Sequence, residues 1–147
     1  MSLRSLALCL ALAAALSGCK IVPLVEAPRM RAGDTPELTR SAIIRALIGF
    51  EYMVDEESPG RIRARYEQNS WTMVVDITYG QDVAIQYADS VGLGHKVEHD
   101  VSYIHRGYNE RVQELAKEIQ RQIMIASLET RPMPTASPAP PPPPTTR

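Results

Sequence analysis

Five polar residues from two separate segments carry side chains that could perform acid–base chemistry. Asp89 and Ser90 stand at the end of a predicted strand, and His105, Tyr108 and Asn109 stand at the start of a predicted helix. If the strand and the helix are neighbours, the five side chains converge on a small ligand site, or on an acid–base set in which His105 titrates near neutral pH. In a structural interpretation, Asp89 or Ser90 orients His105, while Tyr108 and Asn109 fix the entry to the helix. We favour the structural interpretation.

A second group, His95-Lys96-Val97-Glu98-His99, has the H-x-x-E-H spacing of a zinc-protease signature. That chemistry needs both histidines on one helical face, a glutamate base between them and a distant third ligand. Because Gly92 and Gly94 precede the motif and no helical stripe leads on to Asp100, we predict an exposed flexible loop. His95, His99 and Asp100 remain weak candidates for metal binding. The chain has no recognisable nucleophile signature and no glycine-rich phosphate loop, so we predict neither an enzyme nor a cofactor.

The thiol with the best-defined chemistry belongs to Cys19, in the tetrapeptide Leu16-Ser17-Gly18-Cys19. An apolar run from Leu6 to Leu16 precedes it and follows Arg4, which is the order of a basic region, an apolar region and a cleavage site of small residues. This arrangement resembles the lipobox of bacterial lipoproteins. The resemblance implies that the thiol receives a diacylglycerol, that the chain is cut between Gly18 and Cys19, and that a fatty acid such as palmitate then acylates the new amine.

A transmembrane helix and an ordinary signal peptide are the alternatives for this N-terminal region. A membrane span needs about 20 apolar residues, and Ser17-Gly18-Cys19-Lys20 ends the run too early. A single acyl chain binds membranes only marginally, whereas the three chains expected on Cys19 would make attachment permanent. Because Lys20 follows the cysteine where an aspartate would favour the inner membrane, resemblance to known sorting implies a lipid anchor in the outer membrane, with the protein on its periplasmic face.

Composition divides the chain into four segments. Residues 1–18 are a lipoprotein signal peptide, 19–33 a lipidated tether, 34–129 one folded domain, and 130–147 a disordered tail that holds eight of the twelve prolines. The tail should be extended polyproline II, as a spacer or as a segment that docks on an aromatic groove, and we favour the spacer. The formal charge of −1 gives no basic footprint for nucleic acid. Cys9 leaves with the signal and Cys19 carries lipid, so the mature chain forms no internal disulfide.

Within the domain, periodicity predicts a helix, a sheet and a second helix. Asp34 or Thr35 caps the first helix, with Pro36 in its first turn and Glu37 placed for a capping box. A short possible strand at 51–56 and three strands of period two at 61–67, 71–79 and 83–87 follow, and a helix with one apolar stripe covers Arg106 to Leu128. The predicted fold is α+β: an antiparallel meander of three or four strands, flanked by an N-terminal and a C-terminal helix in a two-layer sandwich.

The expected buried positions share one face of each element. They are Ile43, Ala46, Leu47 and Phe50 in the first helix; Ile62, Ala64, Tyr66, Trp71, Met73, Val75, Ile77, Tyr79, Val83, Ile85 and Tyr87 in the sheet; and Tyr108, Val112, Leu115, Ile119, Ile123 and Ala126 in the last helix. Arg61, Arg63 and Arg65 form a basic row on the outer face of one strand. The row either contacts lipid headgroups or an acidic partner, or pairs with neighbouring carboxylates, and we favour pairing.

The stretch Ile85-Gln86-Tyr87-Ala88-Asp89-Ser90, followed by Ile104-His105-Arg106-Gly107-Tyr108-Asn109 and the last helix, resembles a family of small uncharacterised proteobacterial lipoproteins. The resemblance covers about residues 38–127. It departs at Gly92 and Gly94, where asparagines are expected, and at Arg111, near an expected tryptophan. The family has no established activity, so the resemblance implies fold and location alone.

Together these observations predict an outer-membrane-anchored lipoprotein that is a binding or scaffolding module of the cell envelope, with an envelope protein as its possible partner. Two alternatives stay open. One is a small metal- or ligand-binding enzyme that uses the region of His95, His99 and His105. The other is an inhibitor or chaperone of an exported protein.

Overall fold

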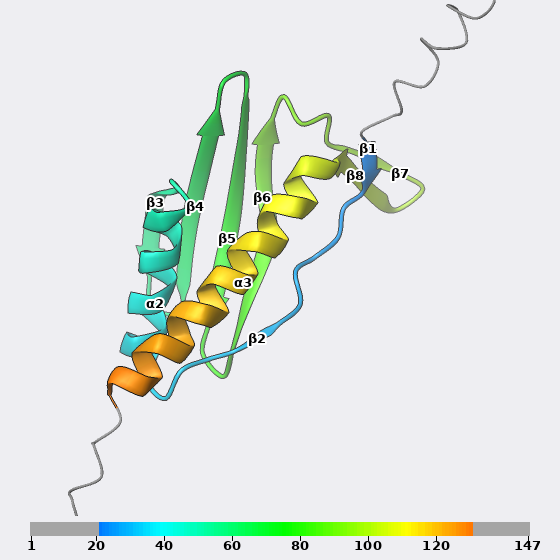
Figure 1. The fold of residues 1–147 in the computed structure, drawn as a ribbon. Helices are drawn as coiled ribbons and strands as arrows, with labels where there is room; N and C mark the ends of the chain where they lie inside the picture. Colours follow the sequence, from blue (N-terminus) through cyan, green and yellow to red (C-terminus); the bar gives the residue numbers. More distant parts are fainter. Residues whose placement is uncertain (1–20, 131–147) are drawn as a thin grey trace, which may run out of the picture.

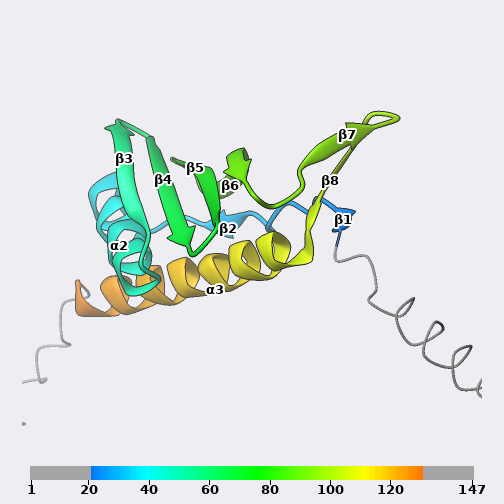
Figure 2. The ribbon, with the colours of Figure 1, turned by 90° about the horizontal axis from the view of Figure 1, so that it is seen from above.

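The computed structural model describes residues 21–130, which form two helices and two antiparallel sheets. Both helices lie on one face of the larger sheet, with α3 running diagonally across it (Figures 1 and 2). The predicted α+β class with a helix before and after the strands is confirmed. The elements in chain order are β1 (Ile21–Pro23), β2 (Met30–Arg31), α2 (Pro36–Gly49), β3 (Met53–Ser58), β4 (Arg61–Gln68), β5 (Trp71–Tyr79), β6 (Asp82–Val91), β7 (Lys96–Glu98), β8 (Val101–His105) and α3 (Arg106–Glu129).

Helix α2 begins with a side-chain cap at Thr35, the second of the two candidates. The hydroxyl oxygen of Thr35 accepts a hydrogen bond from the amide of Leu38 at 3.1 Å, and Pro36 follows as the first helical residue. Glu37 is therefore the second residue of the helix, whereas a capping box needs a glutamate at the third. The predicted apolar face is buried, and the helix ends at Gly49 as its sequence indicated.

The larger sheet is the predicted meander with one strand added, in the order β2-β6-β5-β4-β3. Strand β3 starts two residues later than expected and forms the exposed edge. The period-two pattern holds along β4 and β5, so the predicted inward residues of these strands pack against the helices. In β6 the register shifts, because Val75 pairs with Tyr87 while Val74 pairs with Asp89. Ala88 is the extra residue of this β-bulge, and beyond it the two faces of the strand exchange.

Helix α3 has 24 residues and buries the predicted stripe against the sheet and α2. Its N-terminal cap is His105, whose Nδ1 accepts a hydrogen bond from the amide of Gly107 at 3.1 Å. At 1.5 Å per residue the helix is about 36 Å long. Ile21 and Thr130, the two ends of the described chain, lie near its opposite ends (Figure 1).

The structure corrects the boundary predicted between tether and domain. Residues 21–33 were expected to be a tether, yet β1 pairs with β8 and β2 pairs with β6. Ala27 and Met30 are 8% and 6% exposed, so this segment also contributes to the core. The segment crosses from the small sheet to the large one, so its apolar side chains are spaced irregularly. For that reason hydrophobic periodicity did not identify residues 21–33 as part of the domain.

The structure also corrects the predicted flexible loop at 92–100. Strands β7 and β8 form a hairpin, and β1 completes a second sheet in the order β1-β8-β7. The two turn residues His99 and Asp100 have φ values of 50° and 63°, the left-handed conformation that two-residue hairpin turns require. This hairpin projects from the body of the molecule (Figure 2).

Candidate functional site

The residues with the strongest predicted chemistry lie next to the described chain. Leu16-Ser17-Gly18-Cys19 and the proline-rich tail fall outside residues 21–130, so their predicted roles stay predictions. The first described residue, Ile21, follows Cys19 by two positions and is already paired with His105. Within residues 21–130 neither helix combines the length and the apolar character needed to cross a membrane.

Tyr87 is the centre of a cluster that contains two of the five predicted site residues, Ser90 and Tyr108, together with His95. Its hydroxyl shares a hydrogen bond of 3.0 Å with Ser90 Oγ, and its ring stacks on His95 with centroids 4.4 Å apart. Tyr108 meets the same ring edge-on at 5.5 Å. Burial raises the pKa of Tyr108 well above its usual range, so this phenol stays protonated. The bulge at Ala88 brings Ser90 to the inner side, where Met73 is its strand partner.

This cluster does not assemble the predicted acid–base set. Ser90 Oγ contacts a phenol, while the Asp89 carboxylate accepts a hydrogen bond from the amide of Ser90 at 2.8 Å. His105 caps α3 through Gly107, which differs from the expected contact with Asp89 or Ser90. The five candidates are thus divided between the end of β6 and the start of α3. A half-buried tyrosine stacked on an exposed histidine at a bulge can bind a flat or polar group, and the pair lacks the geometry of a nucleophile with its base.

Asn109 fastens the N-terminal segment to α3. Its Oδ1 accepts a hydrogen bond from the amide of Val25 at 3.0 Å, and its Nδ2 donates to the carbonyl of Pro23 at 2.8 Å. The amide side chain therefore pairs with the backbone as a neighbouring strand would. This contact was expected to fix the entry to the helix. The structure shows that it also fixes the residues that follow β1.

The H-x-x-E-H residues are dispersed over the hairpin. His95 stacks on Tyr87, the carboxylate of Glu98 accepts a hydrogen bond from Lys96 Nζ at 2.9 Å, and His99 occupies the turn. They share no helical face, so the geometry that zinc proteolysis needs is not formed. In the described part of the chain no three His, Cys, Asp or Glu side chains come together as metal ligands, and the weak metal candidates His95, His99 and Asp100 do not gather.

The basic row on the outer face of β4 is paired with carboxylates. Arg61 and Arg63 both donate to Asp76, at 2.7 and 2.9 Å, and Arg65 bonds to Asp55 and Glu67. Hydrogen bonding from Arg63, followed by that from Arg61, lowers the pKa of Asp76 to about 2. The outer face therefore carries neutralised charge, in agreement with the interpretation we favoured.

A partly buried cation that its sequence position did not reveal lies at Arg111. Its guanidinium carbon lies 3.4 Å from the ring centroid of Tyr66 and 5.8 Å from that of Tyr52, and its Nη2 donates to the carbonyl of Phe50 at 3.0 Å. Phe50 is the C-cap of α2, so Arg111 places a positive charge at the negative end of that helix dipole. Burial also raises the pKa of Tyr52 far above its usual range, and the charge on Arg111 opposes the rise.

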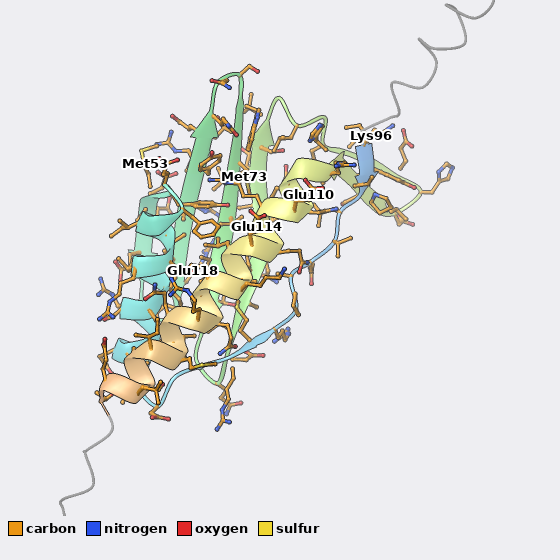
Figure 3. The ribbon with its side chains drawn as sticks, in the orientation of Figure 1. Met53, Met73, Lys96, Glu110, Glu114 and Glu118 are labelled. Carbon is orange, nitrogen blue, oxygen red and sulfur yellow. The ribbon has the colours of Figure 1, made fainter. Side chains whose placement is uncertain are left out.

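One sequence signal could have revealed Arg111: it stands three residues after Tyr108 and four before Leu115. Those spacings place it on the apolar stripe of α3. The other acidic and basic residues of this helix surround the stripe. Glu110, Glu114 and Glu118 follow one another at intervals of four along one side of α3 (Figure 3).

A surface hollow of about 490 Å³ lies beside the start of α2, away from all of these residues. Arg40 and Glu57 line it, and Arg40 donates from both Nε and Nη2 to the two carboxylate oxygens of Glu57. Arg40 and Glu57 are thus engaged with each other, and Glu37 also lines the hollow. Comparison with protein-family models, with curated proteins and with solved structures finds no match.

Proposed function

We propose that this chain is an outer-membrane lipoprotein, anchored through Cys19, whose folded domain is a binding or scaffolding module in the periplasm. The observation that carries the proposal is Leu16-Ser17-Gly18-Cys19 directly after the apolar run that follows Arg4. Lys20 supports the outer membrane as the destination. The lipid anchor holds the protein at the outer membrane, and the folded domain provides the surface that binds an envelope partner.

The described fold supports a module of this kind through its open sheet. Both helices lie on the inner face, and no helix of residues 21–130 lies over the outer face of β4 and β5 (Figure 2). The arginine–aspartate pairs there are partly exposed, with Arg61 at 48% and Arg63 at 33% of their side-chain surface. A paired, patterned polar face of this type suits a protein partner that matches its charges.

Inhibition of lipoprotein signal peptidase in the native host tests the anchor. Globomycin should make an unprocessed precursor accumulate, and the wild-type mature protein should carry acyl mass on its first residue. Cys19→Ser should abolish both the acylation and the cleavage. Cys9→Ser is the matched control, because Cys9 lies in the apolar run and should be replaceable without effect. A Cys19→Ser protein that is processed like wild type contradicts the proposal.

The destination has a separate test. Wild-type protein should sediment with outer-membrane vesicles in a density gradient, and Lys20→Asp should move it to the inner-membrane fraction, while Lys20→Ser should not. Crosslinking in intact cells then identifies neighbours. Capture of an exported enzyme whose activity changes when the purified domain is added would favour the inhibitor or chaperone alternative.

A further inference from the structure

The anchor and the folded domain are separated by almost no chain. Ile21 is hydrogen-bonded into β1, and one residue stands between it and Cys19. Two residues span at most about 7 Å between Cα atoms. If Cys19 is acylated, as proposed above, the start of β1 must therefore lie within about 7 Å of the residue that enters the lipid.

The segment that receives this anchor is held firmly at several points. Ile21, Val22 and Pro23 pair with β8, and the amide of Leu24 donates to the carbonyl of Ser102 at 2.8 Å. The side chain of Ile21 packs so closely on Gly94 that an added Cβ there would lie 2.9 Å from Ile21 Cδ1. Asn109 fixes the next residues to α3. The anchor thus attaches to a unit made of β1, the β7–β8 hairpin and the start of α3.

The hairpin at this end presents apolar side chains to the outside. Val97 and Val101 are 62% and 41% exposed. Lys96 Nζ lies 5.9 Å above the ring of Tyr103 and marks the hairpin in Figure 3. Val101 shares one face of the hairpin with Lys96, Glu98 and Tyr103, while Val97 lies on the opposite face. On the first face the Lys96 ammonium is paired with the Glu98 carboxylate. Exposed valines on both faces, with an aromatic ring beside one of them, suit the interface of a phospholipid bilayer, where rings lie at headgroup level.

We propose that the β7–β8 hairpin contacts the phospholipid surface and thereby orients the domain, with α3 leading away from the bilayer. This rests on the proposed lipid anchor at Cys19. Two valines would not hold a protein on a membrane by themselves. With the anchor fixed beside β1, however, the hairpin contact is intramolecular and acts at a high effective concentration. The far end of α3, about 36 Å away, then projects toward the periplasm.

The acidic side of α3 agrees with this orientation. Glu110 is paired with Arg106, and Glu118 with Arg121. Together with Glu114, these residues follow α3 away from the hairpin (Figure 3). A helix that leads away from the bilayer keeps the Glu114 carboxylate and these two ion pairs away from anionic headgroups.

The test uses nitroxide labels on the full acylated protein in vesicles of phosphatidylethanolamine and phosphatidylglycerol. Cys9 leaves with the signal and Cys19 is blocked by lipid, so an introduced cysteine is the only free thiol. Val97→Cys and Val101→Cys report on the hairpin. Met124→Cys and Leu128→Cys, at positions 60% and 61% exposed, are matched controls near the other end of α3.

Collision with a water-soluble nickel chelate should fall severalfold at 97 and 101 when the protein is moved from detergent to vesicles, and should stay unchanged at 124 and 128. Equal access at all four positions, on protein that floats with the vesicles and carries acyl mass, overturns the hairpin contact and leaves the anchor intact. Protein that carries no acyl mass and does not float overturns the anchor and, with it, this inference.

Discussion

Replacing Arg111 by methionine should lower the free energy of unfolding by about 1 kcal/mol, a small net effect from large opposing contributions. Methionine keeps most of the aliphatic stem and removes the charge. The lost interactions are the hydrogen bond from Nη2 to the carbonyl of Phe50, at 3.0 Å, and the stacking over the ring of Tyr66, at 3.4 Å. The gain is that a partly buried guanidinium no longer has to be desolvated.

Each contribution has a known scale. A hydrogen bond to a charged group contributes about 1.5–3 kcal/mol, and a cation–π contact about 0.5–2 kcal/mol. Against these, Nε of Arg111 is buried without a hydrogen-bond partner, which costs about 1–3 kcal/mol that methionine recovers. The remainder is about 1 kcal/mol in favour of arginine. Arg111→Ala also removes the stem and leaves a cavity, so it should cost about 3 kcal/mol.

A double-mutant cycle isolates the stacking on Tyr66. The variants are Arg111→Met, Tyr66→Leu and the pair, each made in the mature chain from Lys20 without lipid. Urea unfolding can be followed by the fluorescence of Trp71, the only tryptophan, whose ring is 5.5 Å from that of Tyr66. The coupling free energy should be about 1 kcal/mol.

Two results would refute this reasoning. Strict additivity of the two substitutions would show that the short ring contact contributes nothing specific. A methionine variant more stable than wild type would show that desolvation exceeds the cap and the ring contact together. Arg111→Lys separates these cases, because an ammonium keeps the charge near α2 and loses the planar stacking.

Three further predictions concern the outer face, the clamp and one turn. The pKa of Asp76 is about 2 in the folded protein and higher in the unfolded chain, so its contribution to stability is complete above about pH 4 and is lost as the pH falls through 2. Asp76→Asn should therefore be less stable than wild type at pH 7. In urea titrations, the difference in free energy of unfolding between the two proteins should shrink toward zero near pH 2. Asn109→Ala should lower the free energy of unfolding by about 1–2 kcal/mol and speed hydrogen exchange at the amide of Val25. Asn109→Asp keeps the acceptor Oδ1, so it should preserve more of the protection of that amide. Equal exchange in wild type and both variants would contradict the role of Asn109 as a clamp on residues 23–25. Gly92→Ala should cost at least about 2 kcal/mol by thermal unfolding, since φ is +74° and the added Cβ would lie 2.6 Å from the carbonyl oxygen of Ser70; a Tm equal to that of wild type would show that the turn can move.

The regular elements could be predicted from the sequence because their burial repeats. Ile62, Ala64 and Tyr66 lie inward at period two, and Tyr108, Val112 and Leu115 do so at helical spacing. This alternation of buried and exposed positions within one element can be recognised without knowing which residues of the neighbouring strand it pairs with.

The candidate site could not be predicted because it depends on register. Counting by twos from Val83 and Ile85 places Asp89 inward and Ser90 outward. The bulge at Ala88 reverses these two positions, so Ser90 reaches Tyr87, while the Asp89 carboxylate accepts from the Ser90 amide. One unpaired residue, with no mark of its own in the sequence, therefore decided which candidates meet.

The roles of Gly92 and Gly94 could not be predicted from the sequence either. Gly92 and Gly94 suggested a flexible loop, whereas both adopt positive φ and allow close packing on Trp71 and Ile21. The short contact to Ser70 means that this chain, at position 92, needs glycine for space as well as for conformation.

The same packing links the anchor to the orientation of the domain. Gly94 holds Ile21, and Asn109 holds the backbone of Pro23 and Val25, so the first residues after Cys19 move with the hairpin and α3. Asn109→Ala should therefore leave the acyl mass and vesicle flotation unchanged while it narrows the difference in nickel access between positions 97 and 124. If Asn109→Ala also reduced flotation, the clamp would contribute to membrane attachment itself. The short connection between Cys19 and β1 would then not be what orients the domain.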